Sequence, residues 1–137
     1  MSSRELFPII NCADLLSARA FYQEVFSARQ VYQFPETGDP VYLTLEIGDS
    51  KLALGGGTEH ALYGELPLPA TGHAIDLCVY VADLRPTLVR ALEAGGTVPV
   101  QPQDMPWGET VAYVRAPEGT MLLVIQAEAG TELPAAE

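Results

Sequence analysis

Apolar positions along the chain follow alternating strand and helix periods. An extended apolar run, Leu6–Cys12, is followed by Asp14, a residue type that favours helix N-caps. The next stretch has one apolar stripe at the i, i+3, i+4, i+7, i+8 spacing, formed by Ala18, Phe21, Tyr22, Val25 and Phe26. This pattern predicts a strand and then a helix. Three further strands are expected near Val31–Phe34, Val41–Ile47 and Lys51–Gly55, with a hairpin turn at Gly48-Asp49.

The second half of the chain repeats this order 69 residues later, since Ala13-Asp14-Leu15 aligns with Ala82-Asp83-Leu84. No gap is needed between Phe7–Gly56 and Asp76–Ile125. A strand is expected at Ile75–Val81, followed by a helix that Asp83 caps, that has Pro86 in its first turn and that ends at Gly95-Gly96. Three more strands are expected near Thr97–Gln101, Thr110–Arg115 and Met121–Gln126. A turn at Pro117-Glu118-Gly119 joins the last two. Leu84, Leu88, Ala91 and Leu92 form the helical stripe.

The repeat predicts an α+β fold of two βαβββ modules in tandem. Each module is expected to be a four-stranded mixed sheet with one helix packed on it, and the sheets are expected to form a ligand cavity. The predicted boundaries are residues 1–56 for the first module, 57–72 for a linker, 73–126 for the second module and 127–137 for a tail.

Each sheet should have one face away from its helix, which we call its open face. Strand side chains alternate between faces, so the uniformly apolar sets, such as Leu77, Val79 and Val81, are assigned to the helix side. The open face then receives Phe7, Ile9, Asn11, Tyr42, Thr44, Glu46, Leu52, Leu54, Asp76, Cys78, Tyr80, Val111, Tyr113, Arg115, Met121, Leu123 and Ile125. Mostly apolar residues with a few polar groups are typical of a small-molecule pocket, and an ordinary core between modules is the alternative.

Composition narrows the function classes. Seven Lys and Arg against 18 Asp and Glu give a net charge of -11, which disfavours nucleic acid and either attracts cationic ligands or only maintains solubility. The sequence has neither a long apolar run that could span a membrane nor an evident signal peptide, so we expect a cytoplasmic protein without a membrane partner. The two cysteines, Cys12 and Cys78, lack zinc-site spacing and are expected to be reduced packing groups.

Several motifs resemble the glyoxalase / bleomycin-resistance / dioxygenase group, the vicinal oxygen chelate superfamily. They are Phe7-Pro8-Ile9-Ile10, Ala13-Asp14, Ala20-Phe21-Tyr22 and Phe26 in the first module, and Pro106-Trp107-Gly108-Glu109, Val111–Arg115 and Pro117-Glu118-Gly119 in the second. The resemblance implies four metal-ligand places, which fall on Phe7, Leu54, Asp76 and Leu123. Phe and Leu cannot ligate a metal, so we expect no metal, no other cofactor and no catalytic residue. A site built from His73, Asp76 and Glu46 is the alternative, while His60 is expected in a loop.

Without metal, the chain is similar to the drug-binding resistance proteins of this group, which sequester cationic or planar aromatic antibiotics. The resemblance implies a homodimer whose modules line each site together. Trp107 would stack on the ligand or plug the cavity mouth, with Phe7, Tyr42, Tyr80 and Tyr113 as further rings. Asp76 and Glu46 would attract a cation or pair with Arg115. The competing hypotheses are a metal-dependent lyase, isomerase or dioxygenase, a metal-free enzyme with Glu46 or Asp76 as general base, and a partner-binding module.

Overall fold

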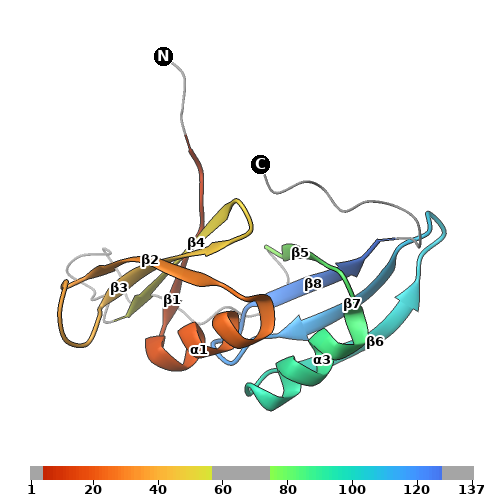
Figure 1. Cartoon of the computed structure of the whole chain (residues 1–137). Coiled ribbons are helices and arrows are strands. Elements are labelled where there is room, and N and C mark those ends of the chain that lie inside the picture. The colour runs from red at the N-terminus through yellow and green to blue at the C-terminus, as the bar shows by residue number, and fades with distance from the viewer. Residues whose placement is uncertain (1–4, 57–74, 128–137) are drawn as a thin grey trace.

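The computed structural model describes residues 5–56 and 75–127, and Figure 1 shows its elements in chain order. The first module contains β1 (Ile9–Cys12), α1 (Leu15–Phe26), β2 (Arg29–Phe34), β3 (Tyr42–Ile47) and β4 (Ser50–Gly56). The second contains β5 (Leu77–Val81), α3 (Leu84–Glu93), β6 (Thr97–Asp104), β7 (Thr110–Arg115) and β8 (Met121–Gln126). The predicted linker and residues 128–137 of the predicted tail lie outside the described residues.

Each module forms one four-stranded sheet. Sheet A has the strand order β1-β4-β3-β2, and sheet B has the order β5-β8-β7-β6. The outer pairs β1–β4 and β5–β8 are parallel and the remaining pairs are antiparallel. The predicted α+β fold, with a mixed sheet and one packed helix in each module, is confirmed. No helix in the described part of the chain is long and apolar enough to cross a membrane.

The two helices begin at the predicted residues but are capped differently. Asp14 accepts a hydrogen bond from the Ser17 backbone N–H at 3.1 Å, which satisfies one of the free donors at the start of α1. Asp83 holds the equivalent position in α3, but its side chain makes no capping bond. The Leu84 N–H instead donates to the Gln126 side-chain oxygen at 2.7 Å. The start of α3 is therefore satisfied by the end of β8.

One apolar core lies on the helix sides of both sheets and joins the modules. Its largest fully buried members include Phe21, Tyr22, Leu43, Leu45, Leu54, Leu84, Val114, Leu122 and Val124. The helices contact each other, and a Cβ on Gly96 would stand 2.8 Å from the Phe21 ring, so the end of α3 fits closely against α1. The Tyr22 hydroxyl also donates to Glu118 of the other module at 2.6 Å.

The strand register corrects one part of the sequence prediction. Glu46 pairs with Lys51, five residues later, whereas Arg115, its counterpart in the second module, pairs with Met121, six residues later. The offset between the modules therefore changes by one residue at the last strand, and the gap-free alignment is wrong there.

This change moves Leu52 and Leu54 to the other face of sheet A. They pair with Leu45 and Leu43 on the helix side and are 5% and 0% exposed, so their expected open-face position is wrong. Ala53 and Gly55 take their places on the open face, because they pair with Thr44 and Tyr42.

Candidate ligand-binding site

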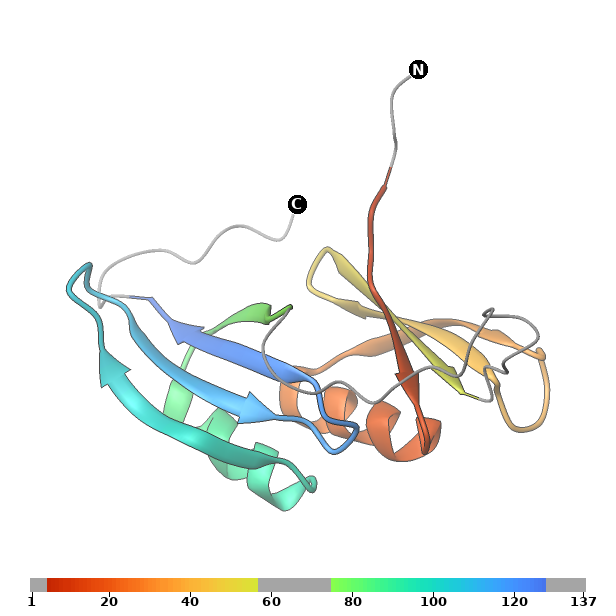
Figure 2. The same cartoon turned by 180° about the vertical axis from the view of Figure 1, so that it is seen from behind.

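The open face of sheet B is the richest in functional groups, and Figure 2 shows its strands β6, β7 and β8 in front of α3. Its cross-strand neighbours follow from the register: Cys78 pairs with Leu123, which pairs with Tyr113. The predicted face is therefore confirmed for Cys78, Tyr80, Val111, Tyr113, Arg115, Met121, Leu123 and Ile125. Cys78 is exposed there, so its expected role as a packing group is wrong, whereas Cys12 is buried as expected.

Two tyrosine–carboxylate hydrogen bonds cross this open face. Tyr113 on β7 donates to Asp76 at 2.7 Å, and Tyr80 on β5 donates to Glu109 at 2.8 Å. In each case the bond spans β8, which lies between β5 and β7. Each hydrogen bond to a carboxylate raises the pKa of its tyrosine above the usual range. Both phenols are therefore protonated donors at neutral pH.

Glu109 also holds the single tryptophan of the chain. Its other carboxylate oxygen accepts from the Trp107 indole N–H at 2.8 Å, while 66% of the Trp107 surface is exposed. Tyr80 is 43% exposed, so one carboxylate carries two rings that both remain accessible. Glu109 is absent from the residues that we expected at the site. The sequence could have indicated Glu109, because it lies two residues before Val111 and therefore falls on the same face as the open-face residues of β7.

The turn that carries Trp107 is set by its sequence. Gly108 donates to the Met105 carbonyl at 3.0 Å and has φ 101°, a value that favours glycine. Pro106 suits the position after Met105 because its φ is fixed near the turn value. The same Pro-x-Gly arrangement recurs at Pro117-Glu118-Gly119, where Gly119 donates to the Ala116 carbonyl. Trp107 lies between Pro and Gly in the first turn and is exposed, whereas Glu118 holds the same position in the second turn and is partly buried against Tyr22.

The open face of sheet A adds a second aromatic group. Tyr42 and Thr44 lie there as predicted, and Ile9 and Asn11 share that face because they pair with Ala53 and Gly55. Phe7 is partly buried and precedes β1.

Two rings on this face were not predicted. Tyr32 pairs with Thr44, and Phe34 pairs with Tyr42; they are 52% and 56% exposed. The rings of Tyr32 and Tyr42 meet edge to face with centroids 6.1 Å apart. A register irregularity between Gln30 and Tyr32 breaks the alternation of β2, so the sequence pattern did not assign these residues to a face.

The charged residues pair differently from the sequence expectation. Glu46 forms its ion pair with Arg29, its neighbour across β2 and β3, rather than with Arg115. Arg115 donates to the Gly119 carbonyl at 2.8 Å. Glu46 thus has a guanidinium beside it, whereas the two donors to Glu109 are neutral.

The residues at the family's metal-ligand places do not fit a divalent metal. With the corrected register these places are Phe7, Ala53, Asp76 and Leu123. Only Asp76 has a ligating side-chain atom, and it accepts a hydrogen bond from Tyr113. No three His, Cys, Asp or Glu side chains within 5–56 and 75–127 are close enough to hold a metal ion. His60 and His73 lie outside these ranges, so the alternative site with His73 is not described by the structure.

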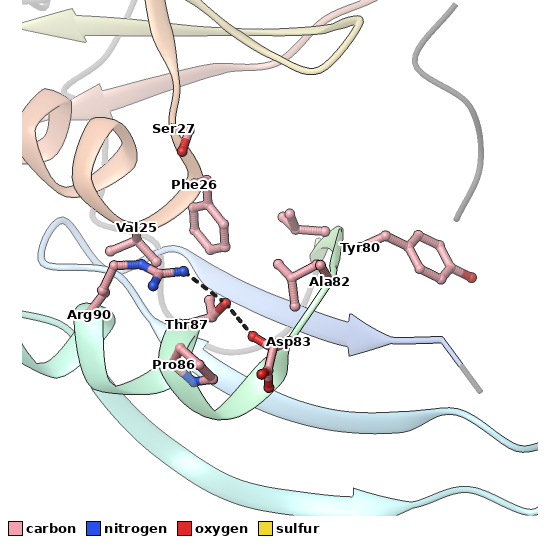
Figure 3. Close-up of a pocket in the computed structure, with 11 residues that line it drawn as sticks. Val25, Phe26, Ser27, Tyr80, Ala82, Asp83, Pro86, Thr87 and Arg90 are labelled. Carbon is pink, nitrogen blue, oxygen red and sulfur yellow. Dashed lines mark hydrogen bonds between the residues drawn. The ribbon is translucent and has the colours of Figure 1, made fainter. Parts of the chain in front are cut away.

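A pocket that we did not predict lies on the helix side, between the end of α1 and the start of α3 (Figure 3). It encloses about 340 Å³. Val25 and Phe26 form one wall, and the other contains Pro86 and Arg90, whose guanidinium is 3.4 Å from the Thr87 hydroxyl. Tyr80 borders this pocket, but its ring points away from the other labelled residues. The pocket is therefore separate from the open face of sheet B.

Comparison with known proteins agrees with this architecture. Residues 7–124 match the model of the Glyoxalase/Bleomycin resistance protein/Dioxygenase superfamily. The chain belongs to this superfamily. No curated protein matches the chain.

Solved structures of similar fold cover nearly the whole chain. TioX from Micromonospora sp. ML1 is 23% identical with a TM-score of 0.69, and the match covers 90% of this chain and 98% of TioX. A glyoxalase-related enzyme from Fulvimarina pelagi is 19% identical with a TM-score of 0.75, covering 91% and 88% of the two chains. A glyoxalase/bleomycin resistance protein/dioxygenase family enzyme from Burkholderia phytofirmans PsJN is 19% identical with a TM-score of 0.72, covering 88% and 96%. At these identities the likeness shows the fold alone.

Proposed function

We propose that this protein binds and sequesters a small planar aromatic or cationic molecule, such as an antibiotic, on the open faces of its sheets without turning it over. The observation that carries the proposal is the pair of accessible rings, Trp107 and Tyr80, held by the Glu109 carboxylate. Aromatic side chains provide large contact surfaces, and rings that are already fixed lose little conformational freedom on binding. The aliphatic residues Val111, Leu123 and Ile125 supply an apolar floor beside them.

We further propose that the binding unit is a homodimer. The open faces carry exposed apolar residues on both sheets, including Ile9, Tyr32, Phe34 and Tyr80. A second copy that places its sheet A opposite sheet B would cover these residues and close a cavity between the sheets. Both cysteines are free, which supports a reducing compartment such as the cytoplasm.

Ligand binding tests this proposal directly, because Trp107 is the only tryptophan and its fluorescence reports on the open face. We expect planar aromatic compounds to change this fluorescence saturably, with one ligand for each cavity and no chemical change in the recovered compound. Trp107→Leu should weaken binding, measured by calorimetry, by roughly tenfold because a stacking surface is lost. Trp107 is exposed, so the variant should fold normally.

The controls separate binding from metal-dependent catalysis. Binding should be unchanged after treatment with a chelator, since the four family ligand places lack a ligand set. Turnover of a bound compound that disappears with the chelator would overturn sequestration in favour of an enzyme. Equal affinity in Trp107→Leu would mean that the ring does not stack on the ligand. Sedimentation equilibrium at several concentrations tests the dimer, and a monomer at all of them would contradict it.

A further inference from the structure

The strongest unassigned feature of the molecule is the position of Glu109. Its two carboxylate oxygens accept one bond each, from Tyr80 at 2.8 Å and from Trp107 at 2.8 Å. Both donors are neutral, so neither hydrogen bond brings a positive charge to this carboxylate beside the two aromatic rings. We propose that Glu109 selects the ligand by charge, so that the site prefers planar aromatic cations over neutral or anionic compounds of the same shape. This inference rests on the proposed binding function.

The hydrogen bonds to Glu109 also change the two rings that donate them. A ring that donates a hydrogen bond to an anion gains electron density, and a cation above its face is attracted more strongly as a result. The hydrogen bond to Glu109 also raises the pKa of Tyr80, so its phenol remains a donor at neutral and mildly alkaline pH. Because 43% of Tyr80 and 66% of Trp107 are exposed, the ring faces are accessible to a ligand.

Among the residues that the structure describes, no Lys or Arg forms an ion pair with Glu109. The basic residues described in the second module are Arg85 and Arg90, both on α3, and Arg115. Arg115 ends β7 and donates to Gly119, while Glu109 immediately precedes the strand. At about 3.4 Å per residue, the length of β7 keeps these two groups roughly 20 Å apart. Salt at physiological concentration screens exposed charges beyond about 8 Å, so Arg115 does little to offset the field at Glu109.

Glu109 has different surroundings from Asp76, the carboxylate that the sequence favoured. Asp76 is partly buried and precedes Leu77, which pairs with Leu122; Arg115 pairs with the adjacent Met121. Asp76 therefore lies at the same end of sheet B as Arg115. Glu109 lies at the opposite end, beside the exposed rings. A cation should be attracted to the Glu109 end.

Three compounds with the same three-ring shape provide the test at pH 8: proflavine, a cation; acridine, which is neutral; and acridine-9-carboxylate, an anion. Calorimetry should give proflavine an affinity roughly tenfold or more above acridine, with the anion weakest. Glu109→Gln should lower proflavine affinity by roughly tenfold or more and acridine affinity by a smaller factor, because Gln removes the charge and keeps one acceptor oxygen for the two ring donors. Asp104→Asn is the matched control, since Asp104 is a carboxylate of the same hairpin that accepts from Thr110. It removes the same charge and should change neither affinity by more than about twofold.

Circular dichroism and the thermal midpoint confirm that both variants fold. If the parent binds all three compounds equally, charge selection is overturned while the proposed binding function stands. If Glu109→Gln weakens acridine as much as proflavine, Glu109 only positions the rings, and the inference is again overturned. If Asp104→Asn weakens proflavine as much as Glu109→Gln does, the preference comes from net charge rather than from Glu109. If the parent binds none of the three, the proposed function and the inference are both overturned.

Discussion

Tyrosine hydroxyls take the place of cations as carboxylate partners in this protein. Tyr22 donates to Glu118, Tyr80 to Glu109 and Tyr113 to Asp76. The chain has 18 acidic residues and only 7 Lys and Arg, so most carboxylates cannot have a basic partner. A neutral donor satisfies a carboxylate oxygen without cancelling its charge. The acidic composition therefore leads to charged groups that are hydrogen-bonded but still able to attract a cation.

The two cysteines provide a prediction at the residue scale. Burial, followed by the nearby Glu118 and Asp14 charges, raises the pKa of Cys12 to about 12, because each disfavours the thiolate. Cys78 is exposed on the open face of sheet B. At pH 8 iodoacetamide should therefore modify Cys78 and leave Cys12 unmodified, as measured by mass spectrometry of peptides. In urea both should react. Equal modification of the two thiols in the folded protein would contradict the burial of Cys12.

At the element scale, α1 and α3 follow similar sequences but have different N-terminal caps. The aligned residues Asp14 and Asp83 both precede a helix, and the sequence predicts a cap at each. Asp14 makes its capping bond, whereas the free N–H at the start of α3 is satisfied by Gln126. Gln126 ends β8, so this contact depends on the parallel pairing of β5 with β8. The choice between local and distant caps could not be predicted from spacing.

This difference gives a prediction for the helix caps. Asp14→Ala and Gln126→Ala should each lower the free energy of unfolding by about 1 kcal/mol, because each leaves a helix N–H without its acceptor. Asp83→Ala should have a smaller effect, since its side chain makes no capping bond. Urea unfolding monitored by circular dichroism measures all three. A loss for Asp83→Ala as large as that for Asp14→Ala would contradict the assignment of Gln126 as the cap.

At the scale of the whole molecule, the modules share one core through their helices. Phe21 packs against Gly96, and Tyr22 donates to Glu118, so both contacts join α1 to the second module. These contacts direct the helix sides of both sheets inward and leave Tyr32, Phe34 and Tyr80 exposed on the open faces. The arrangement thus produces both the stability of the single chain and the surface that we propose for ligand and partner.

Tyr22→Phe tests this junction. At pH 7 the substitution should lower the free energy of unfolding by roughly 1–3 kcal/mol, because it leaves a partly buried carboxylate without its donor. Burial, with the Glu118 charge and hydrogen bond, raises the pKa of Tyr22 well above its ordinary value of 10.0. The parent should therefore keep this stability below about pH 10 and lose it as pH rises further. The phenylalanine variant cannot ionise there, so its deficit should shrink.

The control for this experiment is Tyr80→Phe, which removes an equivalent bond to a carboxylate at an exposed position. It should change the unfolding free energy by less than about 1 kcal/mol, since water replaces the lost donor. Urea titrations at pH 7, 9 and 11 compare the three proteins. A Tyr22→Phe deficit that stayed constant with pH would show that Tyr22 ionisation does not contribute to alkaline unfolding.

The sequence by itself determined the features that depend on near neighbours. The two modules, the helices after Asp14 and Asp83, the turn at Pro117-Glu118-Gly119 and the open-face residues of β5, β7 and β8 follow from alternation and turn residues. These signals arise within a few positions of the chain, where backbone geometry fixes which side chains share a face.

Tertiary structure decided what depends on pairing between distant segments. One residue of difference between two hairpin turns moved Leu54 into the core, and a bulge in β2 put Tyr32 on the open face. The partners of Glu109, Glu46 and Tyr22 are also set by which strands and modules lie side by side. Side chains alternate between the two faces of a strand, so one inserted residue moves every later side chain of that strand to the other face. The periodicity within a single strand does not reveal such an insertion.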